Sequence, residues 1–365
     1  MRILHLLNDI RELGNGIINV AIDLACLQAQ AGHEVAIASA GGEYETLLAT
    51  YGVKHFCLNQ RRHPLNLLKA TWHLQQILRN FQPEIVHAHM ITGAVLAWGL
   101  KRQFSYALVS TVHNEFQRSA VLMGLADRVI AVSRAVADSM QQRGIPAHKL
   151  RVVRNGTLNS PRQRQSLVSQ SLQRPAIVTI AGMYRRKGIA ELIAAFSQIA
   201  EDCPTAHLYL VGDGPDRAQF TLQAQQTSVS DRIHFEGFQP EPQGYLQAAD
   251  VFVLASHREP FGLVLSEARE AGCAIVASYV DGIPEALDQG HAGILIPPAN
   301  VDALSRSITE LLQQPELLQT WRQRSRQNLA WLQVDRVLHD TLLVYQELVD
   351  RAVALQPASE AQTMP

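Results

Sequence analysis

The feature that most constrains this chain is a regular alternation of short apolar runs and longer amphipathic stretches. Short β-branched runs lie at residues 3–7, 35–39, 53–58, 84–87, 107–112, 128–132 and 150–153, and amphipathic stretches such as 17–31, 65–81 and 135–143 separate them. Buried strands that alternate with helices are typical of βαβ units, in which a parallel sheet is covered by helices on both faces. The first half of the chain is therefore predicted to be a doubly wound α/β domain.

The alternation breaks at a polar segment and then resumes. Residues 161–174 are rich in Gln, Ser and Arg and lack a clear apolar period, so they are predicted to be a linker. A second series of apolar runs follows at residues 176–181, 207–211, 233–236, 251–254, 274–277 and 293–296. We expect two Rossmann-like domains, over residues 1–160 and 175–335, that face each other across a central cleft. A last helix over 336–355 and a flexible tail over 356–365 complete this prediction.

Length and composition limit the class of protein. The chain of 365 residues is longer than one ordinary domain. Its composition, 47% hydrophobic and 18% charged residues, is sufficient for two apolar cores. The four cysteines lie far apart without zinc-ligand spacing, which favours a reducing compartment. The chain opens on a strand pattern with no signal peptide, and its longest uncharged stretch, the 16 residues 85–100, is too short to span a membrane. These features favour a cytoplasmic protein.

The strongest local signal is the segment Glu259-Pro-Phe-Gly-Leu-Val-Leu-Ser-Glu267, which directly follows an apolar strand. The Pro-Phe-Gly turn is predicted to open a helix near Gly262, whose first turn offers free backbone N–H groups at Leu263 and Val264. A helix N-terminus favours an anion such as a diphosphate, and the two carboxylates are placed to hold hydroxyl groups on either side of it. The alternative is a surface helix that carries two ordinary acidic residues.

Two further loops suggest anion binding. Arg185, Arg186 and Lys187 follow the first predicted strand of the second half and precede a helix, so they suit a diphosphate, or else form a solvated basic turn. In the first half, Gly14 and Gly16 follow the first strand and allow backbone to approach a ligand closely. The dinucleotide fingerprint G-x-G-x-x-G is incomplete there, so a nicotinamide site is not favoured.

Histidines mark the corresponding end of the first sheet. His113 ends a predicted strand and faces the cleft, where polar residues usually function, although a structural histidine remains the alternative. His87 and His89 lie on one face of a strand, as in some metal sites, but no third ligand stands at a readable spacing. The chain also lacks the D-x-D, G-x-x-x-x-G-K-[ST] and H-E-x-x-H motifs, so no metal is expected.

As a set, these segments resemble the family 4 retaining glycosyltransferases of GT-B fold (glycosyl transferases group 1). The Glu-x7-Glu segment is joined, in the family's order from residue 1 to about 350, by GNG at 14–16, LQAQAGHEV at 27–35, IVHAH at 85–89, VIAVS at 129–133, VRNG at 153–156, RKG at 186–188, GDG at 212–214 and GIPE at 282–285. The resemblance implies that the second domain binds a nucleotide-diphosphate sugar, that the first receives the acceptor, and that the last helix packs back on the first domain.

The resemblance also implies roles for single residues. Glu267 would bind the donor ribose and Glu259 the hydroxyls of the transferred sugar. The backbone amides that follow Phe261 and Gly262, at Leu263 and Val264, would hold the donor diphosphate together with Arg186 and Lys187. Gly14 and Gly16 would close onto it from the first domain. His113 would lie beside the sugar in the acceptor cleft. The family often has Arg where this chain has Met183, and the sequence leaves open whether Arg185 or Arg186 takes over that charge.

The implied reaction is metal-independent transfer of a hexose to a hydroxyl acceptor, with retention of the anomeric configuration. The implied partners are a nucleotide-sugar donor and a saccharide or lipid-linked acceptor, with no cofactor and no nucleic acid. A sugar-nucleotide 2-epimerase of the same architecture, or an inactive protein that binds nucleotide-sugars, remains open as an alternative.

The charges give the only indication about the acceptor side. Residues 1–165 contain 18 Lys and Arg against 10 Asp and Glu, whereas residues 166–365 contain 14 against 23. Arg61, Arg62 and Lys69 lie close to Trp72, and Lys101 and Arg102 follow Trp98. Basic residues beside Trp and Leu are typical of a surface that contacts anionic lipid, which would place the protein at the inner face of a membrane. The alternative is an ordinary amphipathic helix whose apolar face lies in the core.

Overall fold

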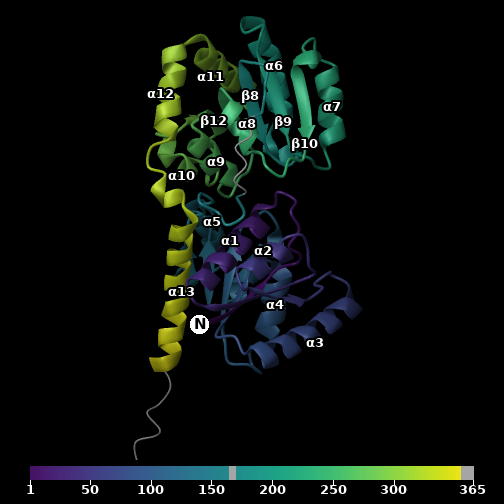
Figure 1. Cartoon of the computed structure of the whole chain (residues 1–365), viewed down its shortest axis with the longest axis vertical. Coiled ribbons are helices and arrows are strands. Elements are labelled where there is room, and N and C mark those ends of the chain that lie inside the picture. The colour runs from purple at the N-terminus through teal and green to yellow at the C-terminus, as the bar shows by residue number, and fades with distance from the viewer. Residues whose placement is uncertain (164–169, 355–365) are drawn as a thin grey trace, which may run out of the picture.

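The computed structural model describes residues 1–163 and 170–354, which form two α/β domains arranged end to end (Figure 1). Part of the predicted linker, residues 164–169, and the predicted tail over 356–365 lie outside the described residues. Every strand predicted from the sequence is present, with bounds that agree within one residue at either end. The predicted pair of Rossmann-like domains is confirmed.

The first domain contains a seven-stranded parallel sheet in the order β3-β2-β1-β4-β5-β6-β7. Its strands and helices are β1 (Arg2–Leu6), α1 (Gly16–Gln30), β2 (Glu34–Ser39), α2 (Glu45–Thr50), β3 (Lys54–Cys57), α3 (Pro64–Phe81), β4 (Ile85–Ala88), α4 (Ile91–Leu100), β5 (Ala107–Val112), β6 (Arg128–Ala131), α5 (Arg134–Gln142) and β7 (Leu150–Val152). Side-chain caps fix where two helices begin: Asn15 accepts from the Ile17 amide before α1, and Ser133 accepts from the Val136 amide before α5.

The second domain contains a six-stranded sheet in the order β10-β9-β8-β11-β12-β13. Its elements are β8 (Ala176–Ile180), α6 (Ile189–Asp202), β9 (His207–Val211), α7 (Arg217–Gln225), β10 (Ile233–Gly237), α8 (Gln243–Ala248), β11 (Val251–Leu254), α9 (Leu263–Ala271), β12 (Ala274–Ser278), α10 (Ile283–Ala286), β13 (Ile294–Ile296), α11 (Val301–Gln313) and α12 (Pro315–Ser325). In both sheets the order of connection reverses beside the first strand, between β1 and β4 and between β8 and β11. Ligands of doubly wound sheets bind at the carboxyl ends of the strands at this switch point.

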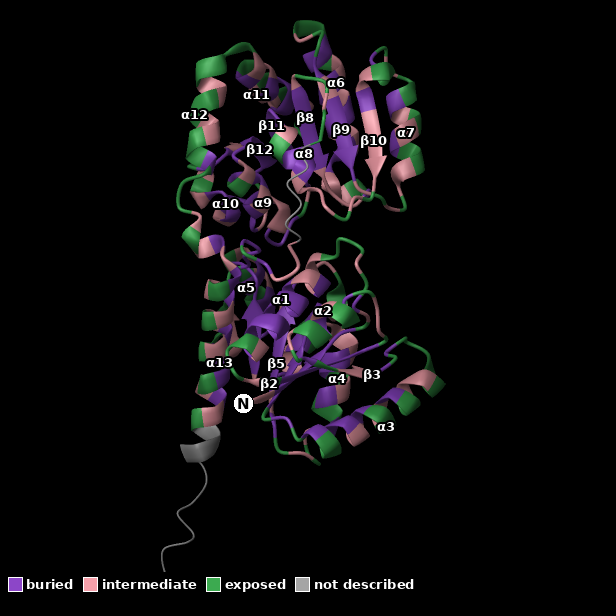
Figure 2. Cartoon of the chain, viewed as in Figure 1, coloured by how far each residue is buried: buried purple, intermediate pink, exposed green. Residues whose placement is uncertain are grey.

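Both sheets are buried between layers of helices. Figure 2 shows buried strands in each domain, and the helices that cover them expose only their outer faces. The strands accordingly read as continuous apolar runs such as VFVL in β11, all four residues of which are buried. No helix among residues 1–163 and 170–354 has the length and apolar character needed to cross a membrane.

The last helix, α13 (Val334–Ala354), leaves the second domain and lies along the first, as the resemblance implied (Figure 1). Its Tyr345 is fully buried with Ile85 of the first sheet in one apolar cluster. Its Glu347 accepts hydrogen bonds from Arg128 at 3.1 Å and from Arg151 at 2.7 Å. Apolar contact and ion pairs together hold α13 on the first domain.

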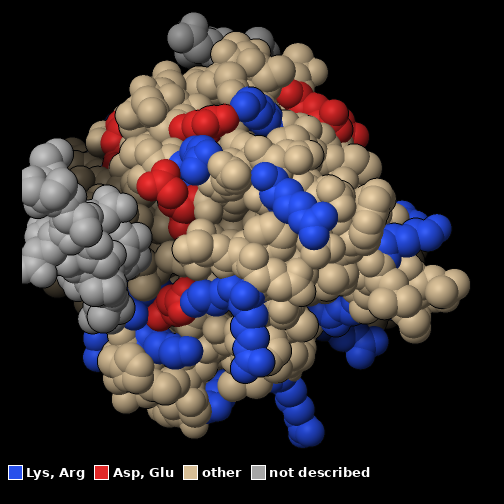
Figure 3. Space-filling model, turned by 90° about the horizontal axis from the view of Figure 1, so that it is seen from below, with Lys and Arg blue, Asp and Glu red and all other residues tan. Residues whose placement is uncertain are grey.

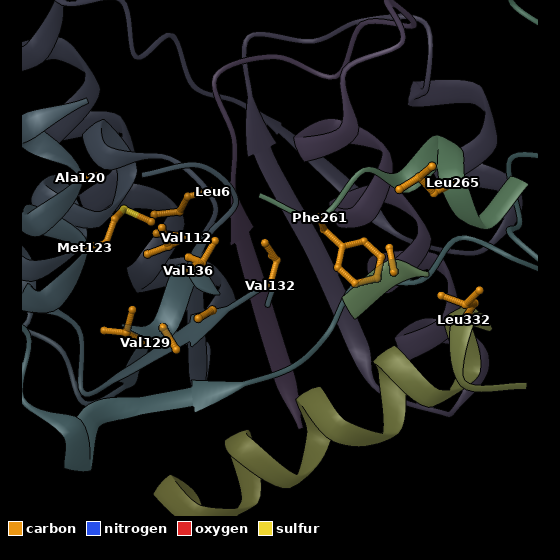
Figure 4. Close-up of a cluster of buried hydrophobic side chains, with 14 of the residues drawn as sticks. Leu6, Val112, Ala120, Met123, Val129, Val132, Val136, Phe261, Leu265 and Leu332 are labelled. Atoms are coloured by element: carbon orange, nitrogen blue, oxygen red, sulfur yellow. The ribbon is translucent and has the colours of Figure 1, made fainter. Parts of the chain in front are cut away.

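The end of the first domain and the segment that leads into α13 lie side by side. The Leu158 amide donates to the Leu332 carbonyl at 3.1 Å, and the Val334 amide donates to the Leu158 carbonyl at 3.0 Å. Figure 4 shows an apolar cluster at the same boundary, to which Val132 contributes from the first domain and Phe261 from the second. The domains are therefore joined by a short backbone ladder beside a shared core.

Candidate functional site

The site in the second domain begins where β8 and β11 end. These strands are hydrogen-bonded neighbours, so the loops that follow them meet at the switch point of the sheet. The ammonium group of Lys187, after β8, forms an ion pair with the carboxylate of Glu259, after β11. The Ser256 hydroxyl donates to the same carboxylate at 3.4 Å. The side chains of Lys187 and Glu259 are 14% and 10% exposed, so this pair is largely removed from solvent.

A glycine allows the two loops to touch. Gly188 has a φ of +68°, and a Cβ atom there would lie 1.9 Å from the carbonyl oxygen of Ala255. Next to it, the His257 amide donates to the carbonyl of Arg186 at 2.8 Å. Any larger residue at position 188 would push the loop that carries Lys187 away from the loop that carries Glu259.

The neighbouring cations have different surroundings. Arg185 is exposed, and its backbone amide donates to Asp216 at 2.9 Å while its guanidinium donates to Gln219. Arg186 lies over the ring of Phe116 in the first domain, 5.2 Å from the ring centroid, and therefore faces the boundary between the domains. Met183, at the position where the family often has Arg, is fully buried in the core of the second domain.

A charged bridge crosses to the first domain beside Glu259. Arg258 donates to Asp281 at 2.8 Å and to Glu115 of the first domain at 3.0 Å. Asp281 also accepts from the backbone amide of Glu259 at 2.9 Å, which holds this loop in place. Burial raises the pKa of Glu115, and its Oε2 atom has no hydrogen-bond partner among the described residues.

Helix α9 begins next to this bridge. Gly262 has a φ of +85° and turns the chain so that the helix starts at Leu263, with the amides of Leu263 and Val264 in its first turn. These amides have no carbonyl partner within the helix, and the positive end of the helix dipole lies there. The Phe261 ring is buried against the edge of Trp331, with 6.0 Å between centroids, so only the backbone of Phe261 is available to a ligand.

The second carboxylate of the motif lies one turn further along α9. Burial raises the pKa of Glu267 to about 7, and the charge of Arg162 opposes this shift. Arg162 itself forms an ion pair with Asp23 of α1 at 2.8 Å. Glu267 therefore belongs to a group of charges drawn from both domains.

The glycine loop of the first domain lies against these elements. Gly14 has a φ of +64°, and a Cβ atom there would be 3.2 Å from the ring of Phe238. A Cβ atom on Gly16 would be 3.0 Å from the side chain of Leu263, the first residue of α9. Because neither residue has a side chain, the start of α1 comes close to the start of α9.

Histidines gather at the carboxyl edge of the first sheet. The Nε2 atom of His113, after β5, is 3.0 Å from Nδ1 of His89, whose Nε2 is 2.9 Å from Nδ1 of His5. The sequence predicted only His87 and His89 as neighbours, and the third imidazole is supplied by His5, which is in register with His87 in the adjacent strand. The imidazoles of His5, His87 and His89 come close enough together to be considered as metal ligands. Their ring nitrogens, however, already lie within hydrogen-bond distance of neighbouring side chains.

Most of the predicted site residues thus fall into two groups, and Glu267 lies with Arg162 and Asp23. Lys187, Glu259 and the start of α9 come together in the second domain, and the glycine loop closes onto them. His113 belongs to the histidine cluster of the first domain. Two further contacts, Phe116 with Arg186 and Glu115 with Arg258, could not be predicted from the sequence, because they depend on how the domains meet.

Comparison with known proteins connects this geometry to a family. The family model "Glycosyltransferase Family 4" matches residues 14–157, and "Glycosyl transferases group 1" matches residues 162–328. One motif from each of these two ranges meets the other in the structure, where Arg154 of VRNG donates to Glu285 of GIPE at 2.9 Å. The two family models together account for most of both domains.

Individual relatives agree with this assignment. The chain is 24% identical over 298 residues to the lipopolysaccharide core biosynthesis glycosyltransferase LpsD of Rhizobium meliloti, which covers 80% of this chain and 83% of LpsD. Among solved structures, Anabaena HepE in complex with UDP has a TM-score of 0.78 at 20% identity, over 97% of this chain and 100% of HepE. Sucrose-phosphate synthase from Thermosynechococcus elongatus has a TM-score of 0.80 at 21% identity, over 96% and 100% of the two chains. The chain belongs to the group 1 and family 4 glycosyltransferases and has their GT-B fold.

Proposed function

We propose that this protein transfers a hexose from a nucleotide-diphosphate sugar to a hydroxyl group of a saccharide or lipid-linked acceptor, with retention of the anomeric configuration and without a metal ion. The observation that carries the proposal is the Lys187–Glu259 ion pair beside the N-terminus of α9. At this switch point a cation and free helix amides suit the diphosphate of such a donor, and a carboxylate suits the hydroxyls of its sugar.

Each group has a defined task in this proposal. The amides of Leu263 and Val264, together with Arg186 and Lys187, neutralise the diphosphate as it leaves. Glu259 accepts hydrogen bonds from hydroxyls of the transferred sugar, and Glu267 accepts them from the ribose. Gly14 and Gly16 close over the diphosphate from the first domain.

The rate gain in this proposal comes from orientation and charge stabilisation. Two substrates held at the domain boundary react as if the step were unimolecular. Preorganised donors at the departing diphosphate stabilise the charge that develops there, which is the task that a metal ion performs in other transferases. For retention, the acceptor approaches on the face that the nucleoside diphosphate leaves, with His113 beside the sugar.

An acceptor-dependence assay tests this function. Purified protein is incubated with a panel of nucleotide-sugars, chosen first by thermal stabilisation, with and without saccharide and lipid-linked acceptors. We expect glycosylated product only when an acceptor is present, with the anomeric configuration of the donor. A 2-epimerase would change the donor without any acceptor, and an inactive binding protein would be stabilised by a nucleotide-sugar without turnover.

We also propose that the first domain contacts an anionic membrane reversibly. On α3, Leu65, Leu68 and Trp72 are 65%, 70% and 58% exposed and lie on one face at helical spacing. The opposite face of α3 buries Leu74, Ile77, Leu78 and Phe81, so the core already has its apolar contact and does not account for the exposed face. Arg61, Arg62 and Lys69 are exposed beside it. Figure 3 shows Lys and Arg side chains spread over this end of the molecule, with acidic side chains along one part of it.

A further inference from the structure

A continuous path of hydrogen-bonding side chains runs from His113 through the first domain to the last helix. From His89 and His5 it continues to Gln28 on α1, whose Oε1 atom is 2.8 Å from Nε2 of His5. The amide nitrogen of Gln28 donates to the Tyr345 hydroxyl on α13 at 3.4 Å. That hydroxyl is 2.6 Å from Nδ1 of His87, whose Nε2 is 2.6 Å from the Thr111 hydroxyl. We call these seven side chains the histidine relay: Thr111, His87, Tyr345, Gln28, His5, His89 and His113.

The imidazoles of the relay are neutral. Burial lowers the pKa of His113 to about 3 and that of His5 to about 4. Burial also lowers the pKa values of His87 and His89 well below the ordinary value. A neutral imidazole has one nitrogen that donates and one that accepts. The tautomer of one ring therefore determines the tautomer of the ring to which it is hydrogen-bonded.

The amide of Gln28 sets the direction of the hydrogen bonds between these rings. In the orientation that the structure gives this amide, Oε1 faces His5 and only accepts, so His5 donates from Nε2 and accepts at Nδ1. His89 then donates from Nε2 to His5 and accepts at Nδ1 from the Nε2–H of His113. This leaves the Nδ1 lone pair of His113 as an acceptor, since among the described residues the hydrogen bond of the His113 ring is made by Nε2.

The other arm of the relay is consistent with the same direction. The Tyr345 hydroxyl accepts from Gln28 and donates to Nδ1 of His87, and the Nε2–H of His87 donates to Thr111. A rotation of the Gln28 amide by 180° would reverse every bond and turn Nδ1 of His113 into a donor. The tautomer of His113 is thus coupled to one amide on α1 and one hydroxyl on α13.

We propose that the histidine relay fixes the tautomer of His113, so that its Nδ1 accepts a hydrogen bond from a hydroxyl of the bound substrate, with Gln28 and Tyr345 as positioning residues. The inference rests on the proposed function, because that function places a sugar hydroxyl beside His113. It also gives α13 a role beyond packing, since Tyr345 supports the amide that directs the relay.

The first test reads the tautomer without any substrate. Long-range ¹⁵N–¹H spectra of histidine-labelled full-length protein distinguish the two neutral tautomers, and the His113→Gln variant assigns the His113 signals among the 14 histidines. We expect a single neutral His113 tautomer with the proton on Nε2. A proton on Nδ1, or an equal mixture of tautomers in the wild type, would overturn the inference. The acceptor-dependence assay is independent of this result, so the two proposals fail separately.

The second test removes the positioning groups. Tyr345→Phe and Gln28→Leu should each convert the His113 signals into a mixture of tautomers and lower kcat roughly tenfold, the scale of one lost hydrogen bond, with an unchanged KM for the donor. Tyr106→Phe is the matched control, because it removes a buried tyrosine hydroxyl of the same domain that donates to a backbone carbonyl outside the relay. Unchanged His113 signals in a folded Tyr345→Phe variant would refute the positioning role. Should Gln28→Leu not fold, Tyr345→Phe and the wild-type spectrum still decide the question.

Discussion

The ammonium group of Lys187 contacts the carboxylate of Glu259, although the two residues are 72 positions apart in the chain. The contact exists because β8 and β11 are adjacent in the sheet while their connection passes through β9 and β10. The same reversal of strand order that creates a ligand site in doubly wound folds therefore creates the ion pair. A bound diphosphate would compete with Glu259 for this lysine, so the free protein holds the cation in place for its ligand.

Loss of either charge of this pair should abolish most of the transfer activity. We expect Lys187→Met and Glu259→Gln each to lower kcat at least about a hundredfold, the scale for removal of one charge-stabilising group. Lys187→Met should also lower the free energy of unfolding, because it leaves a buried carboxylate without its partner.

The double variant Lys187→Met/Glu259→Gln is the control for folding. With no unpaired charge left, it should regain stability relative to Lys187→Met while it stays inactive. Steady-state kinetics and urea unfolding of the three variants measure both effects. Near-normal turnover in any of them would remove these residues from the donor site.

The two neighbouring arginines should differ in nucleotide binding. Arg186 faces the domain boundary, whereas Arg185 is 76% exposed and lies beside Asp216. We expect Arg186→Ala to weaken the binding of the nucleoside diphosphate product at least about tenfold, as for loss of a charge-assisted hydrogen bond, and Arg185→Ala to leave it unchanged. Calorimetric titration of both variants checks this, and the reverse order of effects would assign the diphosphate to Arg185.

Transfer should continue in the presence of a chelator. In the proposed reaction the leaving diphosphate is neutralised by Arg186, Lys187 and the first turn of α9, so excess EDTA should not reduce kcat. Activity that disappears in EDTA and returns with Mg²⁺ or Mn²⁺ would contradict this.

The stability of the ligand-free protein should depend on the ionisation of Glu267. Its pKa is raised to about 7 by burial, so the folded state holds a proton that the unfolded chain has already lost above the ordinary value of 4.5. The contribution of Glu267 to the free energy of unfolding should therefore fall as the pH rises from about 4.5 to 7, and then level off.

Urea unfolding of the wild type and of Glu267→Gln between pH 5 and pH 8 measures this contribution. Glutamine does not titrate, so the stability of the variant relative to the wild type should increase over this range. The exposed Glu201→Gln should show no such trend. A constant difference between wild type and Glu267→Gln would show that the carboxyl group is ionised throughout.

Vesicle binding tests the exposed face of α3. Full-length protein should co-sediment with vesicles that contain anionic lipid at low salt and be released at high salt, because each basic residue near such a surface adds about 1 kcal/mol. Reversal of Arg61, Arg62 and Lys69 to Glu should abolish binding, whereas the exposed Arg306→Glu in the second domain should not. Wild-type protein that stays in the supernatant at low salt would favour a water-soluble acceptor.

The sequence was sufficient to predict the elements of the fold, for a physical reason. Strands buried on both faces are continuous apolar runs, and in the helices beside them apolar residues recur every three to four positions. Both patterns can be recognised within a short segment of the sequence. The Glu259–Glu267 segment could also be identified as a candidate site from the sequence, because a strand end, a glycine turn and a helix start lie within nine residues.

Contacts between different strands and between the domains could not be predicted from local sequence patterns. His5 lies 82 residues before His87, and only the β1–β4 register shows that their side chains are neighbours. Tyr345 reads as one more apolar residue of an amphipathic helix, and its contact with the first domain depends on where that helix docks. Arg186 and Arg185 are adjacent in sequence, and only Asp216 and Phe116 distinguish them.

The ladder between Leu158 and Leu332–Val334 determines how the two domains can move. Two separate connections at distant points would lock the domains against each other, whereas a single flexible connection would let them tumble. Here the end of the first domain is hydrogen-bonded to the segment that leads into α13, so a rotation of one domain about this ladder would leave these hydrogen bonds intact. The loop of Gly14 lies against Phe238 without a backbone link to it, and should separate from the second domain to admit the donor.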